Sequence, residues 1–97
     1  MPTFVLLTRL TPETVGTPRD LKMLEQSVAE RIRRDVPQVK WLANYALLGP
    51  YDYLDVFEAS DETAAAKVAM IIRSFGHAQT ETWLAIPWQQ FRDLIPG

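Results

Sequence analysis

The chain has 97 residues, of which 47% are hydrophobic and 23% charged, and this length and composition indicate one globular domain. The formal net charge of −2 provides no basic field, so nucleic-acid binding is not expected. The absence of cysteine excludes a disulfide framework, a thiolate nucleophile and a cysteine-based metal site. A domain of this size buries only about 60–65% of the surface of its unfolded chain, so a partner subunit is expected to add stability.

The first predicted element is a buried strand at residues 3–10, where the run TFVLLTRL is rich in strand-forming residues. It ends at the segment TPETVGTP, residues 11–18, whose prolines and glycine predict a loop. The N-terminal run has only four consecutive apolar residues, fewer than a signal peptide or a membrane span requires. We therefore expect a cytoplasmic protein with no membrane partner.

An amphipathic helix is predicted next, with the hydroxyl of Thr17 as its N-cap and Pro18 as its first helical residue. Its apolar residues recur at spacings of three and four and comprise Leu21, Leu24, Val28 and Ile32. The helix is expected to stop near Pro37, because the residue before a proline disfavours helical geometry.

Two strands joined by a tight turn are predicted at residues 39–48 and 52–59, with Gly49 and Pro50 in the turn. The first of these strands, VKWLANYALL, is apolar on both of its alternating faces, so we expect it to be covered on both sides. Residues 60–62 then offer capping oxygens and negative charge to a second helix, which is expected to end at Gly76. The apolar stripe of that helix comprises Ala64, Ala65, Val68, Ile71, Ile72 and Phe75.

The last segment is predicted to form a strand at residues 77–86, followed by a short helix that Pro87 opens. The resulting order, βαββαβ with a short C-terminal helix, is that of a ferredoxin-like α+β fold. This fold has a four-stranded antiparallel sheet with two helices on one face, which leaves the other face bare. A bare apolar face predicts that two such sheets pack together in a homodimer and enclose a cavity.

The turn between the paired strands carries a recognisable pattern. Residues Gly49-Pro50-Tyr51-Asp52 match G-x-Y-D, and Gly76 and the run Thr80-Glu81-Thr82 follow in step. In these features the chain resembles the GYD-domain family over nearly its whole length, so residues 1–97 are interpreted as a single GYD-like domain. The resemblance implies a dimeric α+β barrel, assembled as a homodimer or a higher homo-oligomer, and it implies no particular activity.

The residues of this pattern also have a structural explanation. Gly49 suits the positive φ that tight turns need, and Asp52 can accept backbone N–H groups beside the turn. Tyr51 either covers an end of the sheet with its hydroxyl in water or borders a ligand site.

Alternation along residues 51–58 separates two sets of side chains. Leu54 and Val56 are expected to pack under the helices, on the same face as Asp52 and Glu58. The other set is expected to face the cavity between the dimerised sheets and comprises Tyr51, Tyr53, Asp55 and Phe57.

Asp55 is a candidate functional residue, because a buried carboxylate needs a partner or has its pKa raised. The alternative is that Asp55 pairs with a basic neighbour such as Lys40 or Arg9.

His77 is the single histidine and is expected either to pack or cap at the corner before the last strand or to point into the cavity. In the second case, alternation places it on one face with Gln79, Glu81 and Trp83. One histidine and scattered carboxylates do not make a metal site, so neither a metal nor a cofactor is predicted.

The leading hypothesis is a protein that binds a small, partly apolar molecule in the cavity between dimerised sheets. The predicted ligand-binding residues are Trp41, Tyr45, Tyr51, Tyr53, Asp55, His77 and Glu81. The sequence has no G-x-S-x-G elbow, P-loop or dinucleotide fingerprint. The family resemblance leaves open a cofactor-independent oxygenase, an isomerase or a haem-binding enzyme, and a purely structural assembly module is the other alternative.

Overall fold

The computed structural model describes residues 1–12 and 18–97, and its helices and strands follow the predicted order. The strands are β1 (Thr3–Leu10), β2 (Lys40–Ala46), β3 (Tyr53–Glu58) and β4 (Ala78–Ala85). The helices are α1 (Pro18–Asp35), α2 (Glu62–Ser74) and α3 (Trp88–Leu94). The predicted N-cap Thr17 and most of the predicted loop at residues 11–18 lie outside the described residues.

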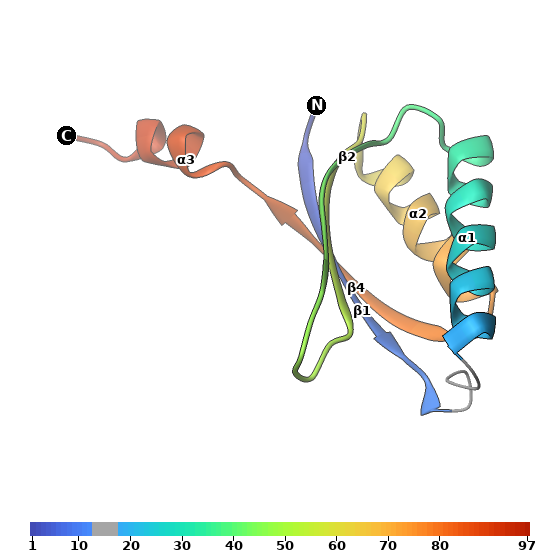
Figure 1. Cartoon of the computed structure of the whole chain (residues 1–97). Coiled ribbons are helices and arrows are strands. Elements are labelled where there is room, and N and C mark those ends of the chain that lie inside the picture. Colours follow the sequence, from blue (N-terminus) through green and yellow to red (C-terminus); the bar gives the residue numbers. More distant parts are fainter. Residues whose placement is uncertain (13–17) are drawn as a thin grey trace.

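The four strands form one antiparallel sheet in the order β2-β3-β1-β4. Both α1 and α2 lie against one face of this sheet, and the opposite face, which we call the open face, is uncovered (Figure 1). The predicted ferredoxin-like α+β fold is therefore confirmed.

The register of β1 decides which side chains face the helices. Phe4 and Leu6 belong to the core beneath the helices and lie opposite Phe57 and Asp55 of β3. Residues directly opposite each other in an antiparallel pair share a face. Consequently Tyr53, Asp55 and Phe57 face the helices.

The prediction that Leu54 and Val56 pack under the helices is wrong. They lie opposite Leu7 and Val5 on the open face and are half-buried there, whereas Phe57 is 0% exposed. Alternation defines two sets of residues but does not say which set is buried, and in β3 both sets contain apolar side chains.

The hydrophobic core lies between the helices and the sheet and is centred on Phe57. Its ring stacks on that of Phe4 at a centroid distance of 5.7 Å and lies 5.3 Å from that of Trp41. The helices and their flanking segments complete this core with Val28, Ile32, Val36, Ala59, Ala64, Ala65, Val68, Ile72 and Ala78.

The ends of α2 form as the sequence predicts. The side chain of Asp61 accepts a hydrogen bond of 2.9 Å from the backbone N–H of Ala64, which caps the first turn. After the last turn, Gly76 adopts a φ of 75°, a left-handed conformation that favours glycine. The chain can therefore leave the helix and reach β4 through His77.

Two apolar regions remain exposed in the single chain. β2 is an edge strand, and the prediction that it is covered on both sides is wrong for the single chain, since Tyr45 is 61% exposed.

Beyond β4, the chain runs away from the body of the domain and ends in α3, none of whose residues is buried (Figure 1). We call residues 86–97 the C-terminal arm; its exposed apolar residues are Ile86, Trp88, Phe91, Leu94 and Ile95.

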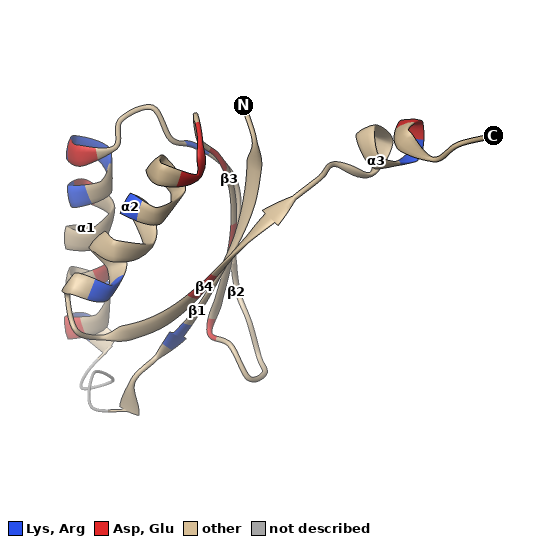
Figure 2. Cartoon of the chain, turned by 180° about the vertical axis from the view of Figure 1, so that it is seen from behind, with Lys and Arg blue, Asp and Glu red and all other residues tan. Residues whose placement is uncertain are grey.

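Charged residues are frequent along α1, whereas most of the C-terminal arm is uncharged (Figure 2). No helix in the described ranges is long and apolar enough to cross a membrane.

Replacing Phe57 with alanine is expected to lower the free energy of unfolding by about 3–5 kcal/mol, because the change leaves a cavity under Phe4 and Trp41. Urea denaturation measures the effect. Met70→Ala on the outer surface of α2, where Met70 is 64% exposed, is the control and should stay within about 0.5 kcal/mol of the parent. A loss at Phe57 no larger than that of the control would contradict this description of the core.

Candidate functional site

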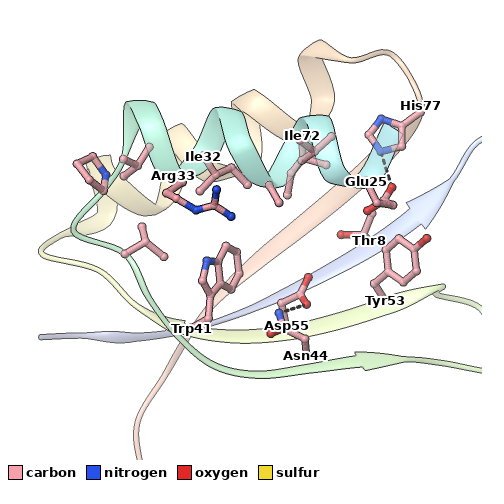
Figure 3. A pocket seen from close by; sticks show the side chains of 15 residues that line it. Thr8, Glu25, Ile32, Arg33, Trp41, Asn44, Tyr53, Asp55, Ile72 and His77 are labelled. Carbon is pink, nitrogen blue, oxygen red and sulfur yellow. Dashed lines mark hydrogen bonds and ion pairs between the residues drawn. The ribbon is translucent and has the colours of Figure 1, made fainter. Parts of the chain in front are cut away.

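A pocket of about 540 Å³ lies between α1 and the helix-facing side of the sheet (Figure 3). The pocket begins where the core ends. Further along the sheet face that carries Phe4 and Phe57, the residues are the polar Thr8, Tyr53 and Asp55. The pocket is lined chiefly by Thr8, Glu25, Val28, Ile32, Arg33, Val36, Val39, Trp41, Asn44, Tyr53, Asp55 and His77. It belongs to a single chain and does not lie between two sheets.

Asp55 projects into this pocket from β3. Nδ2 of Asn44, on the neighbouring strand β2, donates a hydrogen bond of 2.6 Å to Oδ1 of Asp55. Burial raises the pKa of Asp55, and the hydrogen bond from Asn44 opposes part of that rise.

The alternative in which Asp55 pairs with Lys40 or Arg9 is wrong. Nζ of Lys40 lies 3.9 Å from Oε1 of Glu58, and Nε of Arg9 donates to the carbonyl oxygen of Pro50. Both cations lie on residues that face away from the helices, so neither reaches the pocket.

A second carboxylate reaches the pocket from α1. Oε1 of Glu25 lies 3.2 Å from Nε2 of His77, which is 1% exposed at the corner between α2 and β4. Burial raises the pKa of Glu25; His77 opposes this rise, and the charge of Asp55 adds to it. Figure 3 shows the Glu25 carboxylate between His77 and the sheet residues Thr8 and Tyr53.

The predicted alignment of His77 with Glu81 on one face of the last strand is wrong. His77 lies on the helix side of the sheet, against Glu25, whereas Glu81 lies opposite Leu7 on the open face. The strand begins only at Ala78, so the alternation that relates Glu81 to Trp83 does not extend back through the turn to His77.

Tyr53 completes the polar end of the pocket. Burial raises the pKa of its hydroxyl, and the nearby charges of Glu25, Asp52 and Asp55 raise it further. The raised pKa values thus disfavour negative charge at Glu25, Tyr53 and Asp55, which line this end.

The other end of the pocket is apolar and aromatic. Trp41 is 39% exposed and forms a wall below Ile32 of α1, and Val28 also lines the pocket. Arg33 lies at the Trp41 end, away from Glu25 and His77 (Figure 3). The pocket therefore combines a hydrophobic wall with a few polar groups at one end, which is the usual composition of a small-molecule site.

The G-x-Y-D turn holds β3 in register and does not enter the pocket. Oδ2 of Asp52 accepts a hydrogen bond of 2.7 Å from the backbone N–H of Leu10, and its own N–H donates to the carbonyl oxygen of Thr8. The expected role of Asp52 beside the turn is confirmed. Gly49 does not adopt a positive φ, so the conformational reason predicted for this glycine is wrong.

Tyr51 anchors the same turn across the open face. Its hydroxyl donates a hydrogen bond to Oε2 of Glu81 on β4, and the Arg9 guanidinium lies 5.1 Å from the centre of its ring. This hydrogen bond is the main cause that raises the pKa of Tyr51. Tyr51 and Glu81 thus form a contact on the open face, away from the pocket.

The pocket brings together four of the predicted site residues: Trp41, Tyr53, Asp55 and His77. Tyr45 borders a shallower hollow beside it that shares Tyr53 and Asp55.

Among the described residues, sequence reasoning missed four polar residues of the pocket, Thr8, Glu25, Arg33 and Asn44. A signal existed for Glu25, which precedes Val28 by three residues and Ile32 by seven and so lies on the buried stripe of α1. Within the described part of the chain, no group of three or more histidine, aspartate or glutamate side chains is placed to hold a metal ion.

The fold and the pocket define the class: a ferredoxin-like α+β domain with a cavity between its first helix and its sheet. The sequence model of the GYD domain family matches residues 4–95, and the chain therefore belongs to the GYD domain family. A relative from Thermus thermophilus, named glutamine synthetase and cystathionine beta-lyase binding protein, is 37% identical over 87 residues, which are 90% of each protein.

Solved structures share the fold. The crystal structure of TTHA0845 from Thermus thermophilus aligns with a TM-score of 0.61 and 28% identity, covering 90% of this chain and 95% of that one. The crystal structure of FFRP-DM1 aligns with a TM-score of 0.56 and 24% identity, covering 89% of this chain and 100% of that one. At 24% identity, the second likeness bears on the fold alone.

Asp55→Asn is expected to stabilise the protein near neutral pH. The folded-state pKa of Asp55 is raised above 3.8, so ionised Asp55 destabilises the folded state at higher pH. This cost fades as pH falls through the raised pKa and is absent below about 3.8, so the advantage of the variant should shrink on acidification. Urea denaturation over a pH series measures the difference in the free energy of unfolding between the variant and the parent, with Asp93→Asn in α3 as the control. An Asp55→Asn variant less stable than the parent at every pH would contradict the expectation.

Proposed function

We propose that this protein binds a small, partly apolar molecule in the pocket between α1 and the sheet, and that it does so as a homodimer. The observation that carries the proposal is the pocket itself, whose volume of about 540 Å³ falls in the range of about 300–1,000 Å³ typical of ligand sites. Its apolar wall at Trp41 and Ile32 suits an apolar body, and Asp55, Glu25 and Tyr53 can fix the orientation of a polar group.

The homodimer is supported by apolar surface that the single chain leaves exposed. The open face carries Val5, Leu54, Val56 and Trp83, and Trp83 is 53% exposed. The C-terminal arm adds a second apolar surface around a seven-residue helix, which is too short to be stable without packing. Exposed contiguous apolar patches mark interaction sites. A second copy placed against the open face would cover its apolar residues.

Binding of another protein is the second candidate function. The observation that favours it is the relative from Thermus thermophilus, which is named as a binding protein for glutamine synthetase and cystathionine beta-lyase. In this chain, the C-terminal arm offers exposed apolar residues that suit such a contact.

The enzymatic alternatives have unequal support. Raised pKa values of Glu25 and Asp55 in one pocket suit an acid–base catalyst such as an isomerase, and this stays a hypothesis. Haem ligation is not proposed, because His77 is 1% exposed and contacts Glu25. The cytoplasmic location stays a prediction from the sequence.

Filling the pocket tests the ligand proposal. Ala29 lines the pocket on α1, so Ala29→Phe adds a ring to the pocket lining, whereas Ala66→Phe makes the same change on the exposed side of α2 and serves as the control. The neutral fluorophore N-phenyl-1-naphthylamine is the probe, and its fluorescence measures binding. Ala29→Phe should weaken its binding about tenfold or more, and Ala66→Phe should leave it unchanged. Equal binding by both variants, or no binding to the parent protein, would refute the pocket as a ligand site.

Charge on the open face tests the dimer. Native mass spectrometry of the parent protein should give twice the chain mass of 11.1 kDa. Trp83→Arg should shift the protein to the monomer, because a guanidinium in an apolar interface loses its hydration. Met70→Arg on the outer surface of α2 should leave the dimer intact. A monomeric parent, or a dimeric Trp83→Arg variant, would contradict the proposed assembly.

A further inference from the structure

The polar end of the pocket offers hydrogen-bond acceptors to a ligand. Asn44 engages Oδ1 of Asp55, and His77 contacts Oε1 of Glu25. Among the described residues, Oε1 of Glu25 is buried without a hydrogen-bond partner, although Nε2 of His77 lies 3.2 Å from it. An ionised carboxylate has about four lone-pair sites, so both side chains can accept a further hydrogen bond from a donor in the pocket.

The charges around these carboxylates are incompletely balanced. Burial disfavours the ionised form of both, and the charge of Asp55 also raises the pKa of Glu25, so the two carboxylates repel each other. His77 lies on the far side of Glu25 and is buried, while Asp55 has a neutral amide, Asn44, as its partner. A cation placed between the two carboxylates would relieve the repulsion and replace lost hydration.

The rest of the pocket suits the body of such a ligand. Trp41 lies beside Asp55 and presents an aromatic wall, Ile32 of α1 lies on the opposite side, and Val28 adds apolar lining. Aromatic faces attract organic cations as well as apolar groups. The one guanidinium that lines the pocket, Arg33, is exposed and lies at the end away from Glu25 (Figure 3).

We propose that the ligand of this pocket is a small organic cation, a primary amine with an apolar body, whose ammonium group binds between Asp55 and Glu25 while its body packs against Trp41. This inference rests on the function proposed above and adds the chemical class of the ligand. The cavity provides the site, and the two carboxylates select for positive charge.

Three probes with one apolar body and different charge test the inference: 3-phenylpropylamine, 3-phenylpropan-1-ol and 3-phenylpropanoate. Isothermal titration calorimetry near neutral pH gives their dissociation constants for the parent protein. The amine should bind about tenfold or more tightly than the alcohol, and the carboxylate should bind most weakly. Equal binding of amine and alcohol would overturn the inference, and so would a preference for the carboxylate, which would show that Arg33 dominates.

Paired variants locate the selectivity. Asp55→Asn and Glu25→Gln remove one charge each and keep the shape of the side chain, so each should weaken binding of the amine more than binding of the alcohol and thereby reduce the preference for the amine. Glu30→Gln, on the exposed surface of α1, is the matched control and should keep the full preference. An amine preference that survives both pocket variants would overturn the inference.

The two proposals fail in distinguishable ways. If the alcohol binds as tightly as the amine and Ala29→Phe weakens both, the pocket is a ligand site and the cationic class is wrong. If none of the three probes binds and N-phenyl-1-naphthylamine also does not bind, the ligand site and its class are both wrong.

Discussion

The antiparallel pairing of β1 with β3 determines which side chains face the helices and which form the open face. Along this pairing, Phe4 lies opposite Phe57, whereas two residues further along each strand Leu6 lies opposite Asp55, and then Thr8 lies opposite Tyr53. The helix-facing side of the sheet thus changes from apolar to polar within a few residues. The helix α1 crosses both parts, so one fold contains a packed core and, directly beside it, a pocket with acidic groups.

The G-x-Y-D turn maintains this pairing. Asp52 accepts from Leu10 and donates to Thr8, which fixes the first residue of β3 against the last residues of β1. Since side chains alternate along a strand, a shift of one residue would send Tyr53 and Asp55 to the open face. The residues that define the family pattern therefore act on the pocket indirectly, by setting the register that places its carboxylate.

Much of the fold could be predicted from the sequence, and the site only in part. Spacings of apolar residues and the caps at Asp61 and Gly76 are local signals, and they indicated the elements and their order. The buried face of β3 is not a local property, because Leu54 is as apolar as Phe57, and only packing against the helices separates them. Glu25 was missed for a related reason. The sequence shows a charged residue on an apolar helix stripe but not its partner, because His77 is distant in the sequence and lies beside Glu25 only in the fold.

Two partly desolvated carboxylates, Glu25 and Asp55, share one pocket. A carboxyl-detected ¹³C NMR titration of the ligand-free protein tests it most directly, because it follows each carboxyl group separately. We expect both carboxyl groups to titrate above their ordinary pKa values of 4.5 for Glu25 and 3.8 for Asp55, and we expect Asp55→Asn to lower the pKa of Glu25 by removing a like charge. Ordinary pKa values at both groups, or a Glu25 pKa that does not respond to Asp55→Asn, would contradict this expectation.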